Sequence, residues 1–168
     1  MVRDTKIFLA LLWPLATRER LPFDFDPVVD QMKRRVTELS EAAGKIWDFG
    51  PLLQDIDEFS VAVQDLKARN SSAQEGAIAG ANEDAMAISR AINPVLFTIV
   101  GPFHHDPARQ FPLFPGLGAA VELADLDPRS EEAGFIGTEL LRETNRIQRA
   151  LAKATCIALR GASRTSCN

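Results

Sequence analysis

Two adjacent histidines, His104 and His105, are the only imidazole side chains in this sequence, and Asp106 follows them. Neighbouring side chains generally diverge, whereas a zinc site needs three or four ligands that converge on the ion. A Ser-His-Asp triad would need a nucleophile motif such as Gly-x-Ser-x-Gly, which is absent here. We interpret His-His-Asp as the polar tip of a loop, and we predict no catalytic residue, no metal and no cofactor.

Charged side chains recur at helical spacing in two further groups. The acidic group is Glu38, Glu41, Asp55, Asp57 and Glu58, and the basic group is Arg142, Arg146, Arg149 and Lys153. We interpret both as solvated helix faces, with the basic stripe paired to Glu139 and Glu143. The net charge of −4 argues against a general nucleic-acid binder, which would present a basic face.

Apolar residues recur every three or four positions along most of the chain, which predicts an all-α fold. We expect helices at 4–18, from Pro27 to near Gly44, from Pro51 to about 66, at 72–91, at 117–125 and at 130–160. Pro22 separates the first from the second, because proline cannot continue a helix. The pattern predicts a four-helix-type bundle with an extra N-terminal helix. One helical domain would span 1–161, with a frayed tail at 162–168.

Residues 93–116 are expected to form a long Pro-rich loop. They contain Pro94, Pro102, Pro107, Pro112 and Pro115, a density that argues against a regular helix. Their apolar side chains, including Phe97, Ile99 and Phe114, predict that the loop is ordered against the bundle. The last helix is expected to bury Phe135, Ile136, Leu140, Leu141, Ile147, Leu151, Ala154 and Ala158.

The two cysteines and the N-terminal apolar run say little about the compartment. Cys156 and Cys167 are too few for a disulfide framework or a zinc site, so we interpret them as free thiols. The run at 7–13 is short and Arg18-Glu19-Arg20 soon follows, so we favour a mature helix over a signal peptide. Localisation stays unknown, and no apolar stretch approaches the roughly 20 residues that span a bilayer.

Three segments together resemble the C-terminal dimerisation domain of the transferrin receptor and glutamate carboxypeptidase II family. Leu21-Pro22-Phe23-Asp24 resembles the junction that follows the peptidase domain in that family. Residues 92–123 resemble the helix end and loop, and Thr138 to Ala158, with Asn145-Arg146, resembles the last helix. The order and spacing of the segments agree over roughly residues 1–160.

The resemblance implies a helical bundle that pairs two subunits beside a zinc peptidase-like domain, whose upstream metal ligands are missing from this sequence. In the family, the loop before a Phe-Pro-Gly segment lines the substrate pocket, which makes His104, His105 and Arg109 candidates for a pocket rim. Glutamate-specific members carry a Lys-Tyr pair there. This chain has no tyrosine and has Pro107-Ala108-Arg109-Gln110 in that region, so glutamate recognition does not carry over.

We therefore expect a non-catalytic homodimerisation module without its peptidase domain. Two alternatives stay open: a subunit that docks on a separate zinc peptidase and helps line its pocket, and an unrelated helical adaptor. The expected partner is a second copy, with no nucleic acid and no membrane insertion by this chain, although family relatives are often membrane-anchored or extracellular. Ala81 and Ala85, on the small-residue helix 72–91, are the candidate dimer contact, and the first helix is the competing surface.

Overall fold

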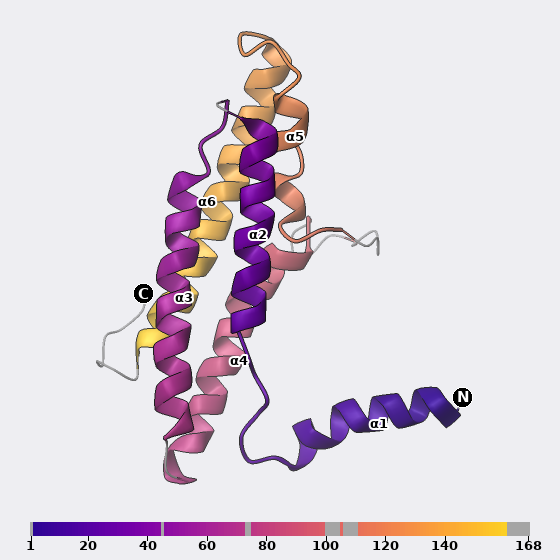
Figure 1. Cartoon of the computed structure of the whole chain (residues 1–168), viewed down its shortest axis with the longest axis vertical. Coiled ribbons are helices and arrows are strands. Elements are labelled where there is room, and N and C mark those ends of the chain that lie inside the picture. Colours follow the sequence, from indigo (N-terminus) through magenta and orange to yellow (C-terminus); the bar gives the residue numbers. More distant parts are fainter. Residues whose placement is uncertain (1, 45, 73–74, 100–104, 106–110, 161–168) are drawn as a thin grey trace.

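A computed structural model describes residues 2–44, 46–72, 75–99, 105 and 111–160. The described chain is all-α, as the sequence predicts. Its elements are α1 (Val2–Thr17), α2 (Asp26–Ala43), α3 (Gly50–Ser71), α4 (Glu75–Phe97), the 3-10 turn η1 (Pro115–Leu117), α5 (Ala120–Leu123) and α6 (Glu131–Leu159). The helices α2, α3, α4 and α6 form a bundle in which α6 packs against both α3 and α4, while α2 packs against α3 and α5 (Figure 1).

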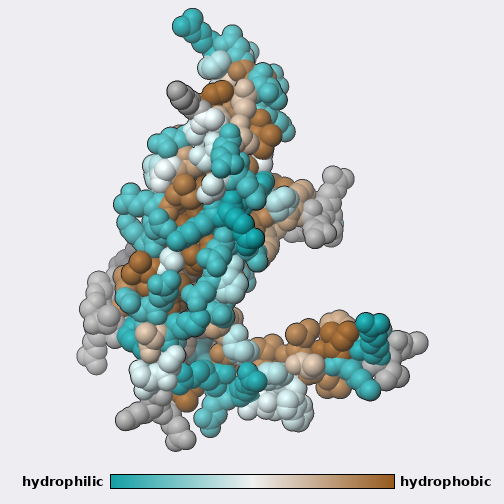
Figure 2. Space-filling view, viewed as in Figure 1, coloured by the Kyte–Doolittle hydropathy of each residue, from teal (hydrophilic) through white to brown (hydrophobic). Residues whose placement is uncertain are grey.

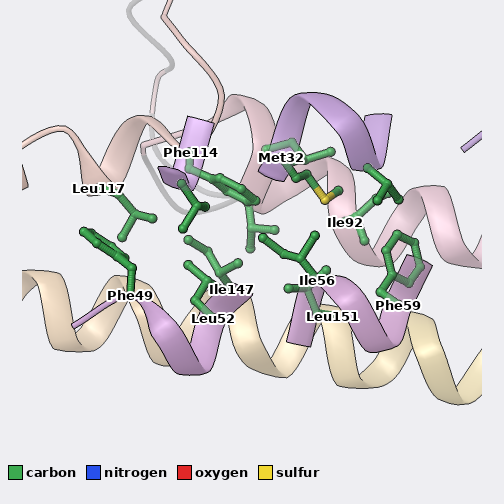
Figure 3. Packing of buried hydrophobic residues seen from close by; sticks show 14 of the residues in the cluster. Met32, Phe49, Leu52, Ile56, Phe59, Ile92, Phe114, Leu117, Ile147 and Leu151 are labelled. Carbon is green, nitrogen blue, oxygen red and sulfur yellow. The ribbon is translucent and has the colours of Figure 1, made fainter. Parts of the chain in front are cut away.

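The core of the bundle lies where the apolar stripes of these helices meet. On α3 the buried residues Leu52, Ile56 and Phe59 recur every three or four positions. They meet Met32 of α2, Ile92 of α4, and Ile147 and Leu151 of α6 (Figure 3). Burying each of these large side chains contributes about 1.5–3 kcal/mol relative to leaving it exposed. The bundle therefore has a continuous hydrophobic core, and none of its buried residues comes from the part of α1 whose side chains are described, residues 3–17.

Two helix ends follow directly from local sequence. Gly44 ends α2 with φ at +60°, in the left-handed region that glycine adopts without strain, and its N–H donates to the Ser40 carbonyl at 3.1 Å. At the start of α6, the Ser130 hydroxyl accepts the Ala133 N–H at 3.1 Å. Glu131 and Glu132 follow in the first turn, where negative charge favours the helix dipole.

The end of α4 differs from the sequence prediction. The helix continues through Pro94 to Phe97, although the helix was expected to end near Ala91. Proline removes one main-chain hydrogen bond from a helix interior. Val95 and Leu96, directly after it, are both buried in the core and offset that loss. The position at which α4 ends is therefore determined by tertiary packing rather than by local helix propensity.

Two residues assigned to the buried side of α6 are in fact exposed. Phe135 is 65% exposed and Leu141 is 53% exposed, whereas Leu140, Ile147, Leu151, Ala154 and Ala158 are buried as expected. At 100° per residue, Phe135 and Leu141 lie about 140° and 100° from Leu140 around the helix. The buried face of α6 is therefore narrower than the positions of its apolar residues predicted.

Two further expectations need correction in this part of the chain. The single short helix predicted at 117–125 is divided into η1 and α5. Cys156 is disulfide-bonded, so it is not the free thiol that the sequence suggested. Cys167 and the expected frayed tail at 162–168 lie outside the described residues.

Candidate functional site

Helix α1 projects sideways from one end of the bundle and is not packed along any other described helix (Figure 1). Every described side chain from Arg3 to Thr17 is exposed except Pro14, which is half-buried. Its large apolar side chains are 48–65% exposed, and they are Ile7, Phe8, Leu9, Leu11, Leu12, Trp13 and Leu15. Figure 2 shows this apolar surface along the middle of α1, with hydrophilic residues at its ends.

Residues 18–25, which we call the linker, fix the direction in which α1 leaves the bundle. The side-chain amide of Asn82, on α4, makes two hydrogen bonds with the linker backbone. Its Nδ2 donates to the Glu19 carbonyl at 2.7 Å, and its Oδ1 accepts the Leu21 N–H at 3.0 Å. The Arg20 guanidinium donates to the Asn70 carbonyl at the end of α3. The linker is thereby tied to both α3 and α4.

An ion-pair cluster anchors the far end of the linker. The Lys67 ammonium lies 3.1 Å from Asp24 Oδ1 and also pairs with Asp26. Its hydrogen bond lowers the pKa of the Asp24 carboxyl, and the hydrogen bonds to Asp26 and Asp24 raise the pKa of Lys67. These groups are well exposed, so the cluster adds orientation more than stability.

Beneath the linker lies a cavity of about 620 Å³ whose walls come from the linker, α3 and α4. Ala81 and Ala85, the candidate dimer contacts, both line it. Ala85 is only 7% exposed and Ala81 is half-buried. Both therefore share a cavity with linker residues, and Ala85 has little free surface. The dimer-contact assignment itself stays a prediction.

Arg146 of α6 holds the first end of the Pro-rich segment, and a main-chain hydrogen bond to α4 holds the other end. Arg146 donates to the Pro94 and Thr98 carbonyls at 3.3 and 3.2 Å, and it pairs with Glu143 at 2.8 Å. Where the chain returns, the Phe114 N–H donates to the Leu96 carbonyl at 3.1 Å. The predicted pairing with Glu143 is thus present, but Arg146 has a second role that charge spacing did not reveal.

Two more contacts hold the returning end of this segment. Arg35 Nε, on α2, donates to the Leu113 carbonyl at 3.2 Å. A Cβ on Gly116 would lie 2.5 Å from Glu143 Oε2, so a larger residue there would require the Glu143 side chain to move. Phe114, with φ at 54°, is buried in the core. By contrast Phe97 and Ile99, which were expected to be covered, are exposed.

The candidate pocket-rim residues are only partly visible. His105 is exposed, while His104 and Arg109 lie outside the described residues. Within the described ranges, no group of three or more His, Cys, Asp or Glu side chains could hold a metal ion. No described helix is long and apolar enough to cross a membrane.

Neither known protein families nor curated proteins nor solved structures provide a match to this chain. The surfaces described above are therefore the basis for assigning a function.

Proposed function

We propose that this chain is a non-catalytic homodimerisation module. The observation that carries the proposal is the exposure of α1, whose seven large apolar side chains find no cover in the described chain. Monomeric proteins rarely expose a contiguous apolar patch of more than a few hundred Å². Two-fold pairing of identical subunits is the commonest way in which soluble proteins cover such a surface.

The resemblance to the transferrin receptor-like dimerisation domain supports the same proposal from the sequence side. It rests on the Leu21 to Asp24 junction, residues 92–123 and the last helix. In the structure Leu21 to Asp24 belong to the linker. Residues 92–123 include Thr98, whose carbonyl accepts a hydrogen bond from Arg146. All three segments contact or belong to the same bundle, as the resemblance implies.

A second candidate function is docking on a separate zinc peptidase. The exposed α1 would also suit that role, since a helix without cover can pack on another protein. The third candidate, an unrelated helical adaptor, requires no self-association. Mixing the chain with a candidate peptidase and measuring a complex separates the second from the other two.

The decisive measurement is the mass of the purified chain by light scattering at micromolar concentration. A homodimer should give twice the monomer mass of 18.4 kDa. A mass that stays at 18.4 kDa throughout the micromolar range would contradict the proposal and leave the two alternatives.

A metal analysis tests the non-catalytic part. We expect substoichiometric zinc and no peptidase activity after purification without added metal. One zinc per chain that disappears in His104→Ala or His105→Ala would show that this part is wrong.

A further inference from the structure

The apolar surface of α1 surrounds the helix. The ten residues from Ile7 to Ala16 carry no charged side chain, and they pass through almost three helical turns. A helix that is apolar on all sides is normally buried in a protein core or spans a membrane, and a span needs about 20 apolar residues, twice the number here. A lipid surface would instead select a helix with one strongly polar face. Cover by protein from more than one side therefore fits α1 best.

The area of this surface matches what a stable subunit contact needs. A large aromatic or aliphatic side chain exposes on the order of 200 Å² when fully accessible. The seven apolar side chains of α1, at 48–65% exposure, therefore present roughly 800 Å². A standard interface buries about 800 Å² on each partner. The apolar surface of one α1 from each copy would therefore supply the area of a standard interface.

In this structure the described chain does not cover its own α1, and contacts of the linker keep the helix in that position. Asn82 holds the backbone at Glu19 and Leu21, directly after α1 ends, and Arg20 is tied to Asn70. These contacts direct α1 away from α3 and α4 (Figure 1). A second molecule can reach the surface without breaking any of them.

Charge favours a second copy of the same chain as that molecule. Helix α1 contains two basic side chains and one acidic side chain, a formal charge of +1. Because the whole chain carries −4, the rest of the chain carries −5. An apolar α1 with a positive net charge is therefore complementary to the acidic remainder of another copy, and this attraction would favour their encounter.

We propose that in the dimer the two α1 helices are buried together between the two bundles, each against its symmetry mate and the bundle of the other copy. A helix of 16 residues is about 24 Å long, long enough to cross a neighbouring bundle. This inference rests on the proposed function, since it names the surface through which the dimer forms.

The test compares full-length variants by sedimentation or light scattering across the micromolar range. Leu12→Glu and Ile7→Glu place a charge on sides of α1 that lie about 140° apart. We expect each to raise the dimer Kd by at least about 30-fold, as truncating a central contact does. Val61→Glu on α3 is the matched control, because Val61 and Leu12 are 60% and 59% exposed. It should change the Kd by less than about threefold.

The outcomes separate the two proposals. A monomeric unmodified chain would overturn both. A dimer that neither Leu12→Glu nor Ile7→Glu weakens would overturn the inference and leave homodimerisation intact. A dimer weakened by only one of them would contradict burial from two sides. Circular dichroism confirms folding, and neither residue belongs to the bundle core.

Discussion

Helices α1 and α2 are similar in length, yet only α2 buries its apolar side chains in the bundle. In α2 the buried residues Val29, Met32, Val36 and Leu39 recur on one face, and polar residues occupy the rest. In α1 the apolar residues are consecutive and surround the helix. A one-sided helix can complete a bundle within its own chain, whereas an all-round apolar helix needs cover that this bundle does not supply. The pattern of apolar residues, more than their number, distinguishes the two.

The largest expected effect compares two phenylalanines, one in each region. Phe59→Ala should destabilise the fold by about 3–5 kcal/mol, because it removes a fully buried ring and leaves a cavity. Phe8→Ala should change the free energy of unfolding by no more than about 0.5 kcal/mol, because Phe8 is exposed. Denaturant unfolding, at a dilution where both variants are monomeric, gives the two values. Equal losses would mean that α1 packs on its own bundle in solution.

The next effect concerns the hydrogen bonds by which Arg146 holds the first end of the Pro-rich segment. Arg146→Met keeps a long apolar stem but removes hydrogen bonds to two carbonyls and to Glu143. We expect a loss of about 1–2 kcal/mol. We also expect faster proteolysis between Gly101 and Gly116, where slow cleavage of the unmodified chain would indicate a loop ordered against the bundle. Arg149→Met, on the exposed face of the same helix, is the control. Indistinguishable variants would show that Arg146 does not hold the segment.

Much of the bundle could be predicted because helix ends and apolar stripes are determined by residues that lie close together in the sequence. Gly44 and the apolar stripe of α3 act through the chain's own geometry, so the sequence is enough to locate them. The path of α4 through Pro94 could not be predicted, because it depends on where Val95 and Leu96 find partners.

The candidate site is harder to predict for the same reason. The direction of α1 depends on a hydrogen-bonding amide 61 residues along the chain from Leu21. No periodic pattern marks Asn82 for that role. Likewise, helix propensity cannot predict that the linker lies next to Ala81 and Ala85, because that position depends on tertiary contacts.

A smaller effect tests the junction between the two regions. Asn82→Ala removes both hydrogen bonds to the linker, and we expect a loss of about 1 kcal/mol. The sharper readout is the fluorescence anisotropy of Trp13 in a Trp47→Phe background, measured on the monomer. Anisotropy should fall in Asn82→Ala, because α1 gains freedom to reorient, and it should not change in the exposed control Asn93→Ala. An unchanged anisotropy would mean that other contacts hold the linker.

The smallest effect concerns a carboxylate that the bundle partly buries. Burial raises the pKa of Asp84 above its ordinary value of 3.8, and the nearby charges of Arg160 and Arg69 oppose that shift only in part. A raised pKa means that folding favours the protonated form, so the stabilising contribution of protonated Asp84 is full below pH 3.8 and is lost as pH rises through the folded-state pKa. Asp84→Asn cannot ionise and should therefore gain stability relative to the unmodified chain between acidic and neutral pH. Unfolding of the two chains across that range measures the difference, with Asp65→Asn on the exposed face of α3 as the control for a lost charge. If Asp84→Asn instead loses stability toward neutral pH, the attraction of Arg69 and Arg160 outweighs the desolvation of the carboxylate, and ionised Asp84 stabilises this end of the bundle.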